Sequence, residues 1–159
     1  MAGEDRAAIA LEAAGIAYEL RRHGRVNSLE EAAAARGIAP RDLVKTLVVR
    51  RGDGDYLFIL VPGDREISWP KLRAHLSVSR LSMPDAATAL AVTGYERGTI
   101  TPFGSTTAWP VIADASLAEP GRRVSIGAGA HGVGATLAAA DMTAALGADL
   151  ADVTDPRPD

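Results

Sequence analysis

Residues 93–104, Thr-Gly-Tyr-Glu-Arg-Gly-Thr-Ile-Thr-Pro-Phe-Gly, form the stretch around which the rest of the chain is organised. Its glycines and its proline predict a shaped loop, because glycine admits positive φ and proline fixes φ without donating a hydrogen bond. The loop also carries Tyr95, Ile100 and Phe103, which makes it too apolar for a plain linker. Two interpretations stay open: one wall of a binding pocket, or a crossing that joins a helix to a strand.

Short helices and short strands flank this loop on both sides. Helical patterns cover residues 4–14, 29–36, 69–76, 84–92 and 142–146. Strand patterns cover residues 17–20, 45–50, 56–61, 78–81, 109–113, 122–126, 136–138 and 148–153. Ser28 and Glu31 form a capping box, in which the Ser28 hydroxyl accepts from the Glu31 amide and the Glu31 carboxylate reaches back. Asp53-Gly54 predicts a hairpin turn between two strands.

The order of these elements predicts an α+β fold. Strands and helices mix without a steady βαβ rhythm, which indicates a mixed sheet flanked by short helices. The sequence contains no internal repeat and no inter-domain linker. We expect one domain over residues 1–154, followed by a frayed polar tail over residues 155–159.

The composition limits the classes of function. The chain has 159 residues, 47% of them hydrophobic and 23% charged, with a net charge of -3, which indicates a globular domain rather than a disordered chain. Slight acidity argues against a protein that coats DNA or other long nucleic acid. No apolar run is long enough to cross a bilayer, and the charged N-terminus is not typical of a signal peptide. We expect a cytoplasmic protein with no membrane partner.

Several kinds of site find no support in the sequence. The chain has no cysteine, which excludes disulfides, cysteine nucleophiles and thiolate metal sites. The three histidines lack metal-ligand spacing with the carboxylates, and no Gly-x-Ser-x-Gly nucleophile elbow is present. We therefore expect no metal and no cofactor. Asp114 ends a strand, where an Asx turn or a helix cap is a strong alternative to a binding role.

Lys45 is the first candidate for a functional residue. It begins a strand that enters the core, so its ammonium either reaches solvent at the strand end or projects into a cavity. The chain has two lysines among its 17 basic residues, so basic surface positions are written almost entirely as arginine. A compact ammonium on a flexible stem suits a phosphate or ribose contact.

A second glycine-rich run, residues 127–134, is the other candidate. Its order, Gly-Ala-Gly-Ala-His-Gly, matches a dinucleotide fingerprint only in part, and no long helix opens after it. The run can instead present backbone N–H groups that stabilise a developing oxyanion. His131 lies among residues too small to bury it, which favours a position at a pocket.

Taken together, these motifs resemble the YbaK/EbsC family. The matching elements are Val44-Lys45-Thr46-Leu47-Val48-Val49, the loop from Thr93 to Gly104, Asp114, and Gly127-Ala128-Gly129. The resemblance covers roughly residues 5–154. This family comprises free-standing aminoacyl-tRNA deacylases and the editing domain of bacterial prolyl-tRNA synthetases, and it implies a barrel-like mixed sheet.

The resemblance also implies an activity and a site. The activity is metal-independent hydrolysis of the ester that joins a wrongly attached small amino acid (alanine, cysteine or serine) to a tRNA, here the proline tRNA. The implied catalytic residues are Lys45, Gly98, Thr101 and His131. The implied substrate-binding residues are Thr46, Thr99, Ile100, Pro102, Phe103, Gly104, Asp114, Gly127, Ala128 and Gly129. The implied partner is the acceptor end of an aminoacyl-tRNA, with an aminoacyl-tRNA synthetase as a second partner.

The residues are compatible with this chemistry. An aminoacyl ester is already activated, so its hydrolysis needs orientation and oxyanion stabilisation more than a strong nucleophile. Lys45 would hold the ribose or phosphate, and amides near Gly98–Thr101 and Gly127–Gly129 would polarise the carbonyl. His131 would position the amino group or the water. Two other classes stay open: a non-catalytic module that binds the tRNA 3′ end, and a small-molecule binding protein.

Overall fold

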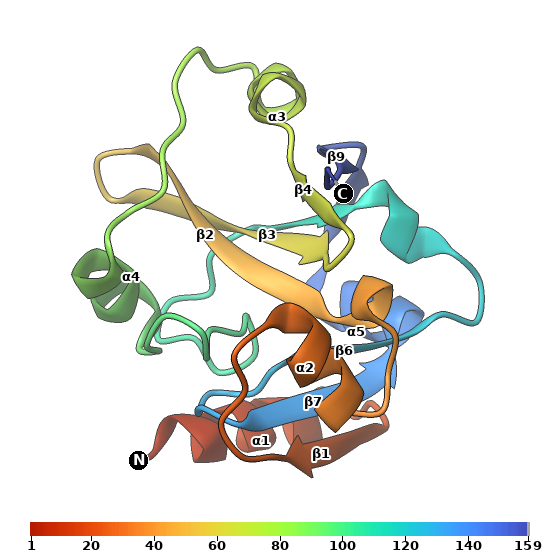
Figure 1. The fold of residues 1–159 in the computed structure, drawn as a ribbon. Coiled ribbons are helices and arrows are strands. Elements are labelled where there is room, and N and C mark those ends of the chain that lie inside the picture. The colour runs from red at the N-terminus through yellow and green to blue at the C-terminus, as the bar shows by residue number, and fades with distance from the viewer. Residues whose placement is uncertain (159) are drawn as a thin grey trace.

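The structure is a computed structural model that describes residues 1–158. Its helices are α1 (Gly3–Ala13), α2 (Leu29–Ala35), α3 (Trp69–Leu76), α4 (Ala86–Thr93) and α5 (Ala139–Leu146) (Figure 1). Its strands are β1 (Tyr18–Arg22), β2 (Val44–Gly52), β3 (Asp55–Pro62), β4 (Arg65–Ile67), β5 (Val111–Asp114), β6 (Arg123–Gly127), β7 (Val133–Ala138), β8 (Asp149–Ala151) and β9 (Thr154–Pro156). None of the helices in the described part is long and apolar enough to cross a membrane.

The strands form three sheets within one domain. One sheet has the order β1-β7-β6 and is antiparallel throughout. The second has the order β2-β3-β5-β8, in which β2 and β3 form an antiparallel hairpin and β5 and β8 add in parallel. The third pairs β4 with β9. The expected α+β class with a mixed sheet is confirmed.

The expected barrel-like closure is wrong. The two larger sheets meet at an isolated parallel bridge between Leu43 and Ser125, and the strands do not pair further along. Beyond the bridge the edge of β2 and the end of β6 line a cavity, so these two strands stand too far apart to exchange ladder hydrogen bonds. The gap between the sheets is therefore where a ligand has room.

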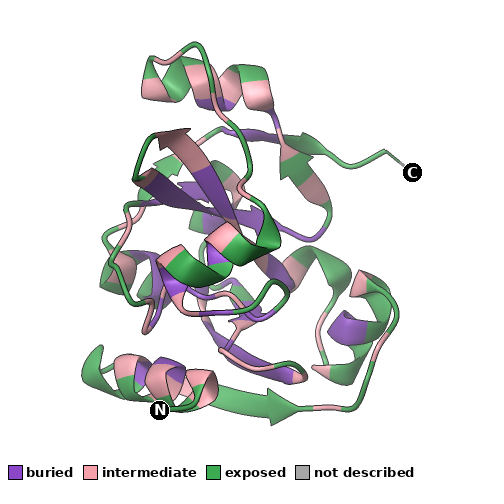
Figure 2. Ribbon diagram, turned by 90° about the vertical axis from the view of Figure 1, so that its left-hand side faces the viewer, coloured by how far each residue is buried: buried purple, intermediate pink, exposed green. Residues whose placement is uncertain are grey.

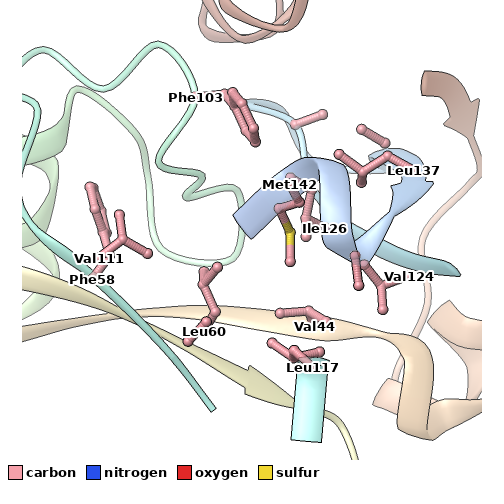
Figure 3. Packing of buried hydrophobic residues seen from close by; sticks show 14 of the residues in the cluster. Val44, Phe58, Leu60, Phe103, Val111, Leu117, Val124, Ile126, Leu137 and Met142 are labelled. Carbon is pink, nitrogen blue, oxygen red and sulfur yellow. The ribbon is translucent and has the colours of Figure 1, made fainter. Parts of the chain in front are cut away.

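The four-stranded sheet is buried on both faces. One face carries Val44, Phe58 and Leu60, which pack with Val124 and Ile126 of the other large sheet (Figure 3). The opposite face carries Leu57, Ile59, Val61 and Ile112, which pack against Leu72 of α3. Burial on both faces explains why β3 reads as a continuous apolar run. Figure 2 shows the same contrast, with buried central strands and an exposed β1 at the periphery.

Local signals in the sequence explain most helix boundaries. The Ser28 hydroxyl accepts a hydrogen bond from the Glu31 amide at 3.0 Å, as the capping box predicts. The Glu31 carboxylate accepts from the Asn27 amide at 2.7 Å, one residue earlier than expected. At the C-terminus of α4, Gly94 takes a left-handed φ of 78° and ends the helix before the central loop.

The C-terminal tail differs from the expectation. Thr154–Pro156 form β9 on β4, and the Arg157 amide donates to the Asp64 carbonyl at 2.9 Å. Residues 155–157 are therefore paired rather than frayed, because β4 offers a free edge; Asp159 lies outside the described residues. Residues 78–81 form no strand, although Ser82 makes an isolated bridge with Arg50.

Candidate functional site

A cavity of about 320 Å³ lies between the edge of β2 and the central loop. Its walls come from residues 43–48, from Gly98 and Ile100 of the loop, and from Gly127 at the end of β6. Arg36, Met83, Pro84, Ala89 and Arg97 complete the lining. Most of the wall is apolar. The loop of residues 93–104 thus leads from α4 towards β5 and also supplies part of a cavity wall.

Contacts with α1 hold this loop in place. The Tyr95 hydroxyl, which is buried, donates to the Phe103 carbonyl at 2.8 Å. Arg6 donates to the Gly94 carbonyl at 2.6 Å, and its guanidinium lies 4.7 Å from the centre of the Tyr95 ring. A loop tied at both ends can present its backbone to a ligand at fixed positions.

Lys45 borders the cavity along the edge of β2, but its ammonium turns away from the cavity. Val44 and Val48 face the core between the large sheets, so alternation directs the Lys45 side chain to the opposite face. There Nζ donates to the Arg65 carbonyl of β4 at 3.0 Å. Burial, and then the positive charge of Arg157, lower the pKa of Lys45.

Thr46 lies on the cavity side of β2. It shares its face with Val44 and Val48 and lines the cavity. Its hydroxyl oxygen is buried and makes no hydrogen bond within residues 1–158. Because a buried polar atom almost always finds a partner, this hydroxyl is available to a bound water or a ligand group.

The backbone amides expected to polarise a carbonyl fall into two groups. Ala128 donates to Val133 at 3.2 Å, and Gly129 donates to Thr99 at 3.0 Å. The Thr99 amide donates to Glu96 at 2.9 Å. The Gly129 amide ties the two loops to each other, and the Ala128 and Thr99 amides each bond within their own segment, whereas the amides of Gly98 and Ile100 make no hydrogen bond within residues 1–158.

Four predicted residues lie inside the loop rather than on the cavity wall. The Thr101 hydroxyl is buried and accepts from the Phe103 amide at 3.2 Å. Phe103 packs in the main core, and Gly104 lies against the backbone of Arg6 with a φ of 78°. Pro102 is half-buried and does not line the cavity. These side chains shape the loop.

Asp114 lies away from the cavity, in a hydrogen-bond network of its own. Its carboxylate accepts from the Thr154 hydroxyl at 2.7 Å, from the Ser116 amide at 3.1 Å and from the Val153 amide at 3.4 Å. Burial would raise the pKa of Asp114, but these hydrogen bonds outweigh it and hold the pKa below its usual value. Asp114 therefore ties β5 to the C-terminal strand.

His131 lies at a neighbouring cavity of about 620 Å³. Its ring packs against Gly98, whose φ of 89° brings the loop backbone beside it, and its Nε2 lies 3.2 Å from a Glu96 carboxylate oxygen. Both side chains are exposed. Within the described residues, no group of three or more histidines and carboxylates could hold a metal ion.

Arg36 is the main lining residue that sequence reasoning missed. It borders the cavity beside Lys45 and also the cavity beside His131. In the sequence it is the last residue before Gly37 and predicts only a helix end. Its position depends on tertiary packing against β6 and β7, for which no local signal exists.

Comparison with known proteins gives a consistent result. A sequence model described as "Aminoacyl-tRNA editing domain" matches residues 23–145. The chain is 36% identical over 104 residues to a proline–tRNA ligase of Desulfovibrio desulfuricans, covering 65% of this chain and 17% of that one. It is 36% identical over 80 residues to a proline–tRNA ligase of Thermosipho africanus, covering 50% of this chain and 14% of that one. The chain thus spans about a sixth or less of these relatives.

Solved structures share the fold over almost the whole chain. A structure described as a candidate trans-editing enzyme for prolyl tRNA synthetase superposes with a TM-score of 0.85 at 24% identity, covering 96% of this chain and 97% of that one. The hypothetical protein APE2540 gives a TM-score of 0.85 at 22% identity, covering 94% and 99%. At these identities the likeness shows the fold.

Proposed function

The chain belongs to the family of aminoacyl-tRNA editing domains, and from this premise we propose that it is a trans-editing deacylase. It would hydrolyse the ester between a small amino acid (alanine, serine or cysteine) and the tRNA for proline, in line with its similarity to proline–tRNA ligases. Such a protein would act in the cytoplasm, on the acceptor end of the tRNA and beside an aminoacyl-tRNA synthetase. The observation that carries the proposal is the cavity between β2 and the central loop.

The size and lining of this cavity support a small amino acid. At about 320 Å³ it lies at the lower end of the range for ligand sites and has room for an aminoacyl group; the limit on side-chain size is part of the proposal. Exclusion by size rejects large side chains more effectively than binding discriminates between small ones. The Thr46 hydroxyl supplies a polar group to a wall that is mostly apolar.

The reaction needs few protein groups. A water oxygen forms a bond to the ester carbonyl carbon, the bond from that carbon to the ribose oxygen breaks, and the proton from water passes to the ribose oxygen. The amides of Gly98 and Ile100 would donate to the carbonyl oxygen as its negative charge develops. Lys45 would leave the Arg65 carbonyl to hold the ribose or phosphate, and His131 would position the water or the amino group.

Deacylation of a panel of charged tRNAs tests the proposal. Purified protein should hydrolyse alanine-, serine- or cysteine-charged tRNA above the spontaneous rate. Lys45→Ala should lower kcat/KM by about a hundredfold, the scale of losing one charged contact to the transition state. Lys71→Ala is the matched control: Lys71 lies on α3, away from the cavity, and pairs with Asp152 and Asp155, so its loss should leave the rate unchanged.

The second candidate is a non-catalytic binding protein, whose ligand in this cavity is either the tRNA 3′ end or a small molecule. It is favoured by the position of the Lys45 ammonium, which contacts Arg65 rather than the cavity. Binding of charged tRNA without hydrolysis of any member of the panel would support this candidate and contradict the deacylase. Loss of hydrolysis with Lys71→Ala equal to that with Lys45→Ala would contradict the proposed site.

A further inference from the structure

Arg36 occupies a position that neither the family resemblance nor the predicted site includes. It caps the C-terminus of α2, and its side chain reaches the face of β6 and β7 opposite the main core. There Nη1 donates to the Ser125 hydroxyl at 3.2 Å, and Nε donates to Nε2 of His23 at 3.4 Å. These contacts hold the guanidinium in place while leaving Nη2 without a hydrogen bond inside residues 1–158.

A glycine in β7 makes the seat for this guanidinium. A Cβ on Gly134 would lie 2.6 Å from Nε of Arg36 and 2.7 Å from Cζ. Only glycine leaves this space open, because every other residue has a Cβ there. The planar guanidinium therefore lies directly on the backbone of β7. The seat is thus built from a helix C-terminus, a serine and a glycine on three separate elements.

The charge of Arg36 is not neutralised by the protein. No Asp or Glu oxygen of the described residues lies within 4.0 Å of its nitrogens. Arg122 provides the contrast, because its buried guanidinium pairs with Asp42 at 3.0 Å. A cation withdrawn from water is costly unless an anion accompanies it. Arg36 is half-buried, and this partial burial lowers its pKa.

Arg36 lies where the two cavities adjoin. Together with Leu43 and Gly98 it lines both the cavity beside Lys45 and the one beside His131. A ligand that filled the first cavity with its reacting end and extended into the second would pass the guanidinium. An aminoacyl ester has no free carboxylate, so the anionic group of such a ligand is a phosphate.

We propose that Arg36 binds the phosphodiester that joins the terminal adenosine of the substrate to the preceding nucleotide. The planar fork of a guanidinium matches two phosphate oxygens, and Nη2 is free to donate. The aminoacyl group then enters the cavity beside Lys45, and the preceding nucleotide lies toward His23 and His131. This assignment rests on the proposed function, since it requires a nucleic-acid substrate.

The test compares two substrates and two variants. Arg36→Gln should lower kcat/KM about tenfold on an aminoacylated minihelix, which carries the phosphate, and less than twofold on aminoacyl-adenosine, which lacks it. Arg123→Gln is the control, because it removes the same charge from an exposed arginine at the far end of β6. It should leave both rates unchanged. If Arg36→Gln lowered kcat/KM equally on both substrates, Arg36 would have only a structural role. If Arg123→Gln lowered kcat/KM as much as Arg36→Gln, the effect would come from net charge. Either outcome overturns the proposal.

A binding measurement separates this proposal from the deacylase itself. A labelled CCA trinucleotide should bind the wild-type protein with a salt dependence that becomes shallower by about 0.7 in log–log slope in Arg36→Gln, as expected for one lost single-strand phosphate contact. If no charged tRNA is hydrolysed but this change is seen, the deacylase fails and the phosphate site stands. If the trinucleotide binds wild type and Arg36→Gln with equal affinity and slope, or binds neither, the phosphate site is wrong.

Discussion

At the scale of single residues, we expect the Thr46 hydroxyl to contribute to substrate binding and not to the stability of the free protein. In most proteins a buried hydroxyl forms a hydrogen bond that contributes to folding. Thr46 has a buried oxygen without a partner in the described residues, and it faces the proposed aminoacyl site. Its contribution is therefore expected in the complex with the substrate rather than in the free protein.

Thr46→Val tests this expectation. Valine has nearly the same shape and removes only the hydroxyl, so the free energy of unfolding should stay equal or rise slightly. Deacylation should fall about tenfold in kcat/KM, because a hydrogen bond to the substrate is lost. Urea denaturation and single-turnover deacylation measure the two effects.

A matched control is Thr143→Val, whose hydroxyl donates to the Ala139 carbonyl at 3.1 Å. That substitution should destabilise the protein by about 1 kcal/mol and leave the rate unchanged. The interpretation of Thr46 would be wrong if Thr46→Val destabilised the protein as much as Thr143→Val.

Asp114 shows the opposite behaviour, because its carboxylate is fully engaged inside the protein. Asp114→Asn should destabilise the protein by about 2–3 kcal/mol at pH 7, since hydrogen bonds to a charged, buried acceptor are lost. The pKa of Asp114 is lower in the folded state than its ordinary value of 3.8. The stabilisation is therefore complete above pH 3.8 and is lost as the pH falls through the folded-state pKa.

The measurement is urea denaturation of both proteins at pH 7 and at steps below pH 4. The difference between wild type and Asp114→Asn should narrow as the solution becomes more acidic. The control is Asp53→Asn, which alters a fully exposed side chain. Its free energy of unfolding should equal that of the wild type at every pH tested. A deacylation defect in folded Asp114→Asn without loss of stability would instead support the binding role that the family resemblance implies for Asp114.

At the scale of elements, the β6–β7 hairpin uses two paired glycines for different purposes. Gly127 and Gly134 lie opposite each other in the register. A Cβ at Gly127 would lie 2.9 Å from the Ile100 carbonyl oxygen, which belongs to the backbone of the central loop. A Cβ at Gly134 would instead meet the guanidinium of Arg36, the far end of a flexible side chain.

These neighbours predict different effects of adding one methyl group. Gly127→Ala should destabilise the protein by about 1–3 kcal/mol, because the loop backbone must move. Gly134→Ala should leave the free energy of unfolding within about 0.5 kcal/mol, because Arg36 can turn aside. Thermal and urea denaturation of the two variants test this, and a larger loss in Gly134→Ala than in Gly127→Ala would contradict it.

Local chemistry explains why some elements could be predicted from the sequence and others could not. The Ser28 cap, the Asp53-Gly54 hairpin and the Gly94 stop each act within a few residues, and each is found in the structure. The strands β4 and β9 were missed because each is three residues long and exists only through pairing with the other. No window of sequence contains both.

At the scale of the whole molecule, the same limit applies to the site. The glycine and proline pattern left a pocket wall and a plain crossing both open, and the family resemblance pointed to Gly98 and Ile100, which line the cavity. Alternation placed Thr46 and Lys45 on opposite faces of one strand. No local pattern in the sequence shows whether the two larger sheets close into a barrel. They do not close, and the gap between them is the cavity. Arg36 reaches this gap from another helix, so only the assembled fold reveals it.

The C-terminal strand connects stability to the site across the molecule. Thr154 is fully buried, donates to Asp114 and accepts from Nε of Arg65 at 2.6 Å, and the carbonyl of Arg65 receives the Lys45 ammonium. Ending the chain at Val153 should therefore destabilise it by about 3 kcal/mol or more, since buried groups of Asp114 lose their partners. Ending it at Arg157 keeps β9 and should change the free energy of unfolding by less than about 0.5 kcal/mol. Urea denaturation measures both, and equal stability of the two shortened chains would show that β9 does not hold β4 in place.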